Sequence, residues 1–239
     1  KLGLLEGKEK EVKQLEIDRY NKTKTTEQLK SKEKQLADEL KGKQKRRREL
    51  DAAIKKAIEG EILAANAKKA KKAKESKGAT TPAKTVSKNE IMLTPDELLI
   101  NNSFVSNKGK LPWPVVKGAK VSDFGSYPHP DVPSVKIDNR GIDILVEPGT
   151  SVRAVFQGEV TGVMDVMGTK VLMVRHGEYL SVYQNLASIS VKKGDKVSTK
   201  QTIGTVAKSS TNNTYELHFE VWQNNTYLNP NHWLSSRQN

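Results

Sequence analysis

The sequence has 239 residues and a formal net charge of +13, with 41 Lys and Arg residues against 28 Asp and Glu residues. This length is sufficient for one or two domains with a buried core. The absence of cysteine excludes disulfides and thiolate metal sites. No apolar run is long enough to span a bilayer, and the basic part of the chain has almost no aromatic residues to stack on bases. Composition therefore argues against a membrane span and against nucleic-acid binding.

Residues 1–50 have apolar positions seven apart, which predicts a coiled coil. One heptad register places Leu5, Val12, Leu40 and Ile54 at position a, and Leu15, Leu29, Leu36 and Leu50 at position d. Polar residues interrupt this seam, so the coil is imperfect and needs a partner helix. Because the sequence starts inside a helical pattern without a signal peptide, we expect this segment to be the C-terminal part of a longer coiled coil.

Residues 51–75 predict a helical regulatory segment with a different apolar spacing. Ile54, Ile58 and Ile62 lie four residues apart, and Leu63 lies beside them. Such a stripe suits docking on a globular surface. The alternative, that these residues are the last turns of the coil, is equally compatible with the pattern.

Residues 76–110 predict a linker that contains one short helix near residues 95–102. The first part has too little apolar surface to offset the entropy of ordering it. Thr94 is then a helix N-cap, Pro95 the first helical residue, and Glu97 the partner that completes a capping box. Leu98 and Leu99 supply the apolar side of the helix.

Residues 111–239 predict an all-β domain, because short β-branched runs alternate with glycine turns. The runs are residues 151–156, 159–164, 170–176 and 180–184. Paired glycine turns before strands are typical of compact barrel-sandwich domains. The expected fold class is therefore α+β in separate regions, with an N-terminal coiled coil and linker helices followed by an all-β domain.

Several motifs in residues 111–236 occur in the order and spacing of a known domain. They are Gly141-Ile142-Asp143, Pro148-Gly149-Thr150, Val174-Arg175-His176-Gly177, Leu217-His218-Phe219-Glu220 and Asn229-Pro230. Together they resemble the LytM, or lysostaphin-type, zinc endopeptidase domain. A coiled coil ahead of such a domain further resembles the EnvC-type murein hydrolase activators.

The resemblance implies a damaged zinc site. Asp143 and His218 correspond to two zinc ligands, whereas the third ligand, a histidine, is Asn139 here. The two catalytic histidines correspond to Asn185 and Glu216. An amide is a poor zinc ligand and cannot exchange a proton near neutral pH. We therefore expect no catalysis and no cofactor, with Asp143 and His218 hydrogen-bonded to one another across adjacent strands.

The resemblance also implies a function. A vestigial groove suits the binding of another protein, here an N-acetylmuramoyl-L-alanine amidase that is activated in cell division and daughter-cell separation. The groove residues are Asn139, Asp143, Asn185, Glu216, His218 and Trp222. Core packing is nearly as good an interpretation for Trp222. The resemblance further implies a periplasmic location, docking of the coiled coil on an FtsEX-type transporter, and peptidoglycan as a further ligand.

A regulatory hypothesis follows, in which one apolar helix occupies the groove at rest. The candidates are Ile54, Ile58, Ile62 and Leu63 in one segment, and Leu98 and Leu99 in the other. The main alternative is an active zinc endopeptidase that cleaves peptidoglycan cross-links with Glu216 as its base. A passive peptidoglycan-binding module is a second alternative. A biotin- or lipoyl-type carrier is disfavoured, because no lysine at a turn is flanked by methionines.

Overall fold

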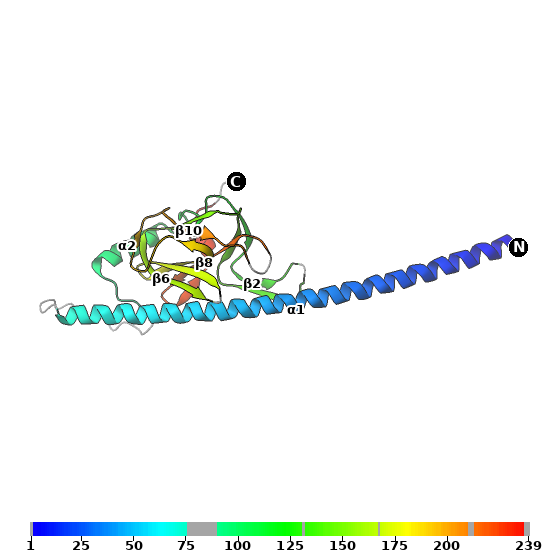
Figure 1. Ribbon diagram of the computed structural model, residues 1–239, viewed down its shortest axis with the longest axis horizontal. Coiled ribbons are helices and arrows are strands. Elements are labelled where there is room, and N and C mark those ends of the chain that lie inside the picture. The colour runs from blue at the N-terminus through cyan, green and yellow to red at the C-terminus, as the bar shows by residue number, and fades with distance from the viewer. Residues whose placement is uncertain (1, 76–89, 131, 167, 210–212, 237–239) are drawn as a thin grey trace. The chain divides into compact units, whose positions relative to one another are not determined.

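The computed structural model describes residues 2–75, 90–130, 132–166, 168–209 and 213–236. These residues form a long helix, a short helix and an antiparallel β domain (Figure 1), so the predicted fold class is confirmed. The chain divides into two compact units, residues 1–45 with 127–137 and residues 46–126 with 138–239. The predicted linker lies outside the described residues over positions 76–89.

Helix α1 (Leu2–Glu75) runs without a break through the expected boundary at residue 50. In the first unit, Val12, Leu15 and Leu29 are more than half exposed, and the coiled coil stays a prediction. The heptad register is wrong at its C-terminal end, because Leu50 and Ile54 pack on the β domain instead. Among the described residues, no helix combines the length and the apolarity that a membrane crossing requires.

Helix α2 (Pro95–Ser106) begins with the predicted capping box: Thr94 Oγ1 accepts from the Glu97 amide, and the Glu97 side chain accepts from the Thr94 amide. The helix is longer than expected because Phe104 anchors its last turn. The Phe104 ring stacks on His176 and Trp233, with centroid distances of 4.8 and 4.9 Å. Phe104 is fully buried, so α2 belongs to the β domain rather than to a linker.

A ten-stranded antiparallel sheet forms the β domain, with strand order β1-β4-β11-β8-β7-β6-β9, while β2 and β3 form a separate pair. The strands are β1 (Ala119–Ser122), β2 (Gly125–Pro128), β3 (Lys136–Asn139), β4 (Ile142–Leu145), β5 (Ser151–Arg153), β6 (Gly158–Val166), β7 (Thr169–His176), β8 (Tyr179–Ile189), β9 (Lys196–Val197), β10 (Thr202–Val206), β11 (Glu216–Gln223) and β12 (Thr226–Leu228). Off the main order, β10 pairs with β5 and β8, and β12 pairs with β11. A 3-10 turn, η1 (Pro230–His232), follows.

The central strands are buried on both faces. One face carries the main core, which includes Phe104, Leu172, Val174, Tyr183 and Phe219. The opposite face carries Val171, Met173, Leu180, Val182 and Trp222, which pack against Ile54, Ile58 and Ile62 of α1. The C-terminal half of α1, cyan in Figure 1, runs beside β6 and β8. Burial on both faces explains why β7 reads as a continuous apolar run instead of alternating. We call the face that packs against α1 the α1-covered face.

Phe104→Ala should destabilise the second unit by about 3–5 kcal/mol, because it removes a fully buried ring and leaves a cavity. Denaturant unfolding followed by circular dichroism measures this loss. The matched control is Val105→Ala on the same helix, where the side chain is 41% exposed and the expected change is about 1 kcal/mol or less. Equal losses in the two variants would contradict the anchoring role of Phe104.

Candidate functional site

The candidate site lies where β4 and β11 run side by side on the α1-covered face. Asp143 of β4 is paired directly with His218 of β11, so the two side chains share one face of the sheet. His218 Nδ1 lies 2.6 Å from Asp143 Oδ1. The hydrogen bond expected between these residues across adjacent strands is therefore present.

An arginine of α1 completes this pair. Arg47 Nη2 lies 2.8 and 3.1 Å from the two carboxylate oxygens of Asp143, and 2.7 Å from His218 Nδ1. Burial alone would lower the pKa of Arg47, but Asp143 outweighs it and raises this pKa, so the guanidinium stays charged. A fixed positive charge from α1 thus sits between the two residues that correspond to zinc ligands.

Asp143 has no acceptor position left. Its oxygens accept from Arg47, from His218 and, at 3.1 Å, from Asn139 Nδ2. An ionised carboxylate offers about four lone-pair positions, and these contacts use them. Burial alone would raise the pKa of Asp143, but Arg47 and His218 hold it well below its usual range. The carboxylate therefore remains ionised inside the protein.

His218 bridges two carboxylates. Its Nε2 lies 2.9 Å from Glu220 Oε1, and Trp222 Nε1 donates to Glu220 Oε2 at 2.7 Å. These three residues alternate along β11 and so share the α1-covered face. Burial and Arg47 act to lower the pKa of His218, but Asp143 and Glu220 outweigh them and raise it to about 9. At neutral pH the imidazole is therefore protonated and donates from both nitrogens.

Asn139, which stands at the position of the third ligand, is already engaged. Its Nδ2 donates to Asp143 and to Ser122 Oγ, at 3.1 and 3.0 Å. Its Oδ1 accepts from the Gly141 amide at 3.2 Å. The amide is 3% exposed and holds the β3–β4 corner. Asn139 thus acts as a structural hydrogen-bonding residue and does not present its oxygen to an ion.

Asn185 and Glu216 are adjacent, and both side chains are hydrogen-bonded within the domain. Asn185 has φ +64°, and its Nδ2 donates to the carbonyl oxygens of Ala207 and Glu216 at 3.1 and 2.7 Å. The Glu216 carboxylate accepts from Thr214 Oγ1 at 2.5 Å. In the positions of the two catalytic histidines, the chain therefore has a strand-joining amide and a carboxylate bound to a threonine.

These residues do not fit a hydrolytic zinc centre, which needs three protein ligands and an open position for water. Asp143, His218 and Asn139 are each committed to other partners. Within the described ranges, no group of three or more His, Asp or Glu side chains has an arrangement that could hold a metal ion. The guanidinium of Arg47 supplies the positive charge that the acidic residues of the site require.

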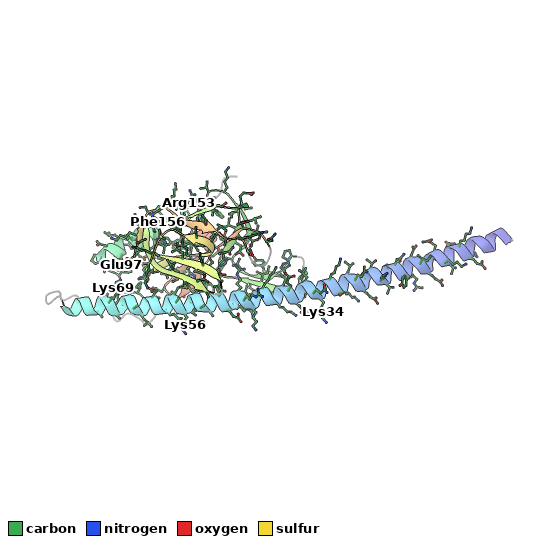
Figure 2. The ribbon with its side chains drawn as sticks, viewed as in Figure 1. Lys34, Lys56, Lys69, Glu97, Arg153 and Phe156 are labelled. Atoms are coloured by element: carbon green, nitrogen blue, oxygen red, sulfur yellow. The ribbon has the colours of Figure 1, made fainter. Side chains whose placement is uncertain are left out.

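Further contacts fix α1 along this face. Asp51 is 4% exposed and pairs with Arg140, whose Nε lies 3.4 Å from Asp51 Oδ2. Burial and the nearby Glu220 raise the pKa of Asp51, and Arg140 opposes this shift. Two turns of helix further on, Ile58 is fully buried. At the end of α1, Lys69 Nζ lies 2.5 Å from Glu97 Oε2, a pair labelled in Figure 2.

The predicted groove-occupying residues divide into two groups. Ile54, Ile58 and Ile62 are at most 3% exposed and cover the apolar part of the face. Leu63, Leu98 and Leu99 are 57%, 48% and 69% exposed, so their assignment to the groove is wrong. Leu63 follows Ile62 by one residue and so points about 100° away from the buried side of the helix. In α2, Phe104 rather than the leucines makes the buried contact.

Trp222 is fully buried beneath α1, as part of the cluster around Ile58. It is thus a packing residue in the described state, and a partner protein can reach it only if α1 leaves.

Three residues of the site were missed in the sequence: Arg47, Asp51 and Glu220. Arg47 and Asp51 lie seven and three residues before Ile54, so they share its side of the helix. This spacing is the signal that could have found them. It was hidden because Arg47 is the middle residue of a run of three arginines in a strongly basic helix.

The sequence of the β domain is similar to a known protein family and to several known proteins. Residues 138–230 match the family model of Peptidase family M23. The cell division protein DipM of Caulobacter vibrioides is 30% identical over 119 residues, which are 48% of this chain and 18% of DipM. The murein hydrolase activator NlpD of Escherichia coli is 28% identical over 128 residues, 52% of this chain and 31% of NlpD. The β domain is therefore similar to M23 peptidase domains, also called LytM domains, over residues 138–230.

Among solved structures, Helicobacter pylori Csd3 is 26% identical, with a TM-score of 0.46 over 54% of this chain and 36% of that chain. The aligned part spans about a fifth of the length of DipM and about a third of that of NlpD.

The bridging role of His218 predicts a pH-dependent stability. Its pKa is about 9 in the folded chain and about 6.5 in the unfolded chain, so the stabilisation is complete below pH 6.5 and is lost as the pH rises through 9. The expected loss is about 3 kcal/mol between pH 6 and pH 10. Denaturant unfolding across this range measures it.

The matched variants are His218→Asn and His232→Asn, the second at an exposed position. We expect His218→Asn to lose most of this pH dependence and His232→Asn to keep it. An unchanged profile in His218→Asn would assign the dependence to other groups.

Proposed function

We propose that the β domain activates a peptidoglycan N-acetylmuramoyl-L-alanine amidase by binding it on the α1-covered face, and that α1 blocks this face at rest. The observation that carries the proposal is the Arg47 guanidinium bound to Asp143 beside His218, with Ile54 and Ile58 covering the adjacent apolar surface. The M23 domain and the similarity to proteins named as a murein hydrolase activator and a cell division protein support it.

Binding is favoured over hydrolysis for a chemical reason. Hydrolysis needs a base that takes a proton from water. Asn185 has no accessible pKa, and Glu216 is hydrogen-bonded to Thr214. His218 is protonated at neutral pH and is occupied on both nitrogens. The groups that remain recognise charge and shape, which are the properties of a binding surface.

Activation then requires an exchange of partners. Full burial of an isoleucine contributes about 1.5–3 kcal/mol, so the three isoleucines hold α1 on the sheet against the entropy of ordering it. The helix is part of the same chain, which raises its effective concentration into the millimolar range. An amidase must bind the open state more tightly than α1 does.

The remaining parts of the proposal concern the N-terminal helix and its location. We propose that residues 1–50 belong to a coiled coil that docks on an FtsEX-type transporter in the periplasm. A force or rotation applied to α1 would reach Arg47 directly, because α1 continues through residue 50 as one helix. Peptidoglycan is a further ligand of the same assembly in this proposal.

The absence of a fitting zinc site predicts no peptidase activity. The purified chain, incubated with equimolar Zn²⁺, should release no soluble fragments from cell-wall sacculi when amidase is left out. Chromatography of the digest measures this. Fragments produced by the chain alone, and lost with Glu216→Gln, would establish the peptidase alternative.

Release of α1 should increase activation. Ile58→Asp places a charge in the fully buried cluster and is expected to free the helix, so that amidase-dependent dye release from labelled sacculi rises about tenfold or more at limiting activator. The control is Lys56→Asp, on the exposed side of α1 (Figure 2). Equal rates for both variants and the parent would contradict inhibition by α1.

A further inference from the structure

Three side-chain donors on the domain are buried without an acceptor in the described chain: Thr161 Oγ1, Gln184 Nε2 and Arg175 Nη2. Two of them, Gln184 and Arg175, lie on the central strands β8 and β7. Gln184 is only 3% exposed. Buried donors are nearly always paired in folded proteins, so each such case calls for an explanation. Burial lowers the pKa of Arg175, an effect opposed by carboxylates that include Glu61 of α1.

Both donors belong to the α1-covered face. Gln184 of β8 is paired with Val171 on one side and with His218 on the other. Arg175 of β7 is paired with Leu180. Directly paired residues share a face of an antiparallel sheet, and Val171, Leu180 and His218 all lie on the α1-covered face. The two donors therefore stand along the surface that α1 occupies at rest.

Helix α1 is a poor match for these donors. It presents Ile54, Ile58 and Ile62 to this face, and isoleucine has no acceptor. The two carboxylates that α1 also carries nearby are paired elsewhere, Asp51 with Arg140 and Glu61 with Lys193. Its backbone carbonyls are already used within the helix. An unpaired buried donor loses more than a typical hydrogen bond gains, because the lost hydration is not replaced. By contrast, Arg47 donates to both carboxylate oxygens of Asp143 at the other end.

We propose that the activating partner places a helix on this face and supplies acidic or amide side chains opposite Gln184 and Arg175. This inference rests on the proposed function. The helix shape follows from α1, the occupant that the face accepts. Since a helix has no free carbonyl in its middle, the acceptors must be Asp, Glu, Asn or Gln. The partner's helix also carries an apolar stripe that covers Trp222, and an Arg or Lys that pairs with Asp143 in place of Arg47.

The unpaired donors beneath α1 favour its replacement by a partner that can pair them. Helix α1 satisfies the charged end through Arg47 and the apolar part through its isoleucines, yet leaves two donors unpaired. A partner that pairs all of them binds the same surface with more hydrogen bonds. The resting helix is thus held firmly enough to inhibit and loosely enough to be displaced.

The test replaces the Gln184 amide by an apolar group of similar shape, Gln184→Met in the full chain. Removal of an unpaired donor should strengthen the docking of α1, so hydrogen exchange of amides 47–62 should slow about tenfold. The same change, made together with Ile58→Asp to free the face, should weaken amidase binding about tenfold, measured by calorimetry.

We expect Gln184→Met to strengthen the docking of α1 and to weaken the binding of the amidase. Val171→Ala is the control, because both occupants use this apolar side chain and both readouts should weaken. The inference is overturned if Gln184→Met weakens both readouts or changes neither. Arg175→Met repeats both measurements at the second donor. If Gln184→Met does not fold, the Arg175→Met result is the test of the inference. If Ile58→Asp alone neither binds nor activates the amidase, the proposed function itself fails.

Discussion

The contact of the Arg47 guanidinium with Asp143 and His218 is the constraint on which the described state depends. Asp143, Glu220 and Asp51 bring three acidic groups into a buried region, and such charges are stable there only when they are paired. Arg47, protonated His218 and Arg140 supply the matching positive charges. Removing α1 would leave Asp143 without its strongest partner, so the face needs an occupant that carries a cation.

The same contact sets this site apart from a hydrolytic one. In a hydrolytic site the negative ligands would bind a metal ion and leave one position for water. Here the Arg47 guanidinium lies on Asp143 instead, and Asn139 is hydrogen-bonded to Ser122 and Gly141. In the described state, the position of α1 decides whether Asp143 keeps its arginine partner.

The α1-covered face is complementary to α1 at some of its groups but not at all of them. Its charged end and its apolar cluster are satisfied by α1, whereas Gln184 and Arg175 are not. Under the proposed function this combination lets α1 cover the face and still be displaced, because a partner that pairs more of its groups binds more tightly. Helix α2 differs: its capping box and the stacked Phe104 tie it to the main core, so it is part of the scaffold.

Local patterns in the sequence predict most of the elements and the pair at the centre of the site. Heptads, the Thr94 capping box and β-branched runs have local physical causes, so fold class followed from them. The spacing of Asp143 and His218 within known motifs identified the altered zinc site. The three-dimensional packing is what places Arg47 on Asp143, buries Ile54 against the sheet and leaves Leu63, Leu98 and Leu99 exposed. These outcomes depend on the rotation and register of a helix against a distant sheet. One arginine among 41 basic residues carries no local mark of its partner.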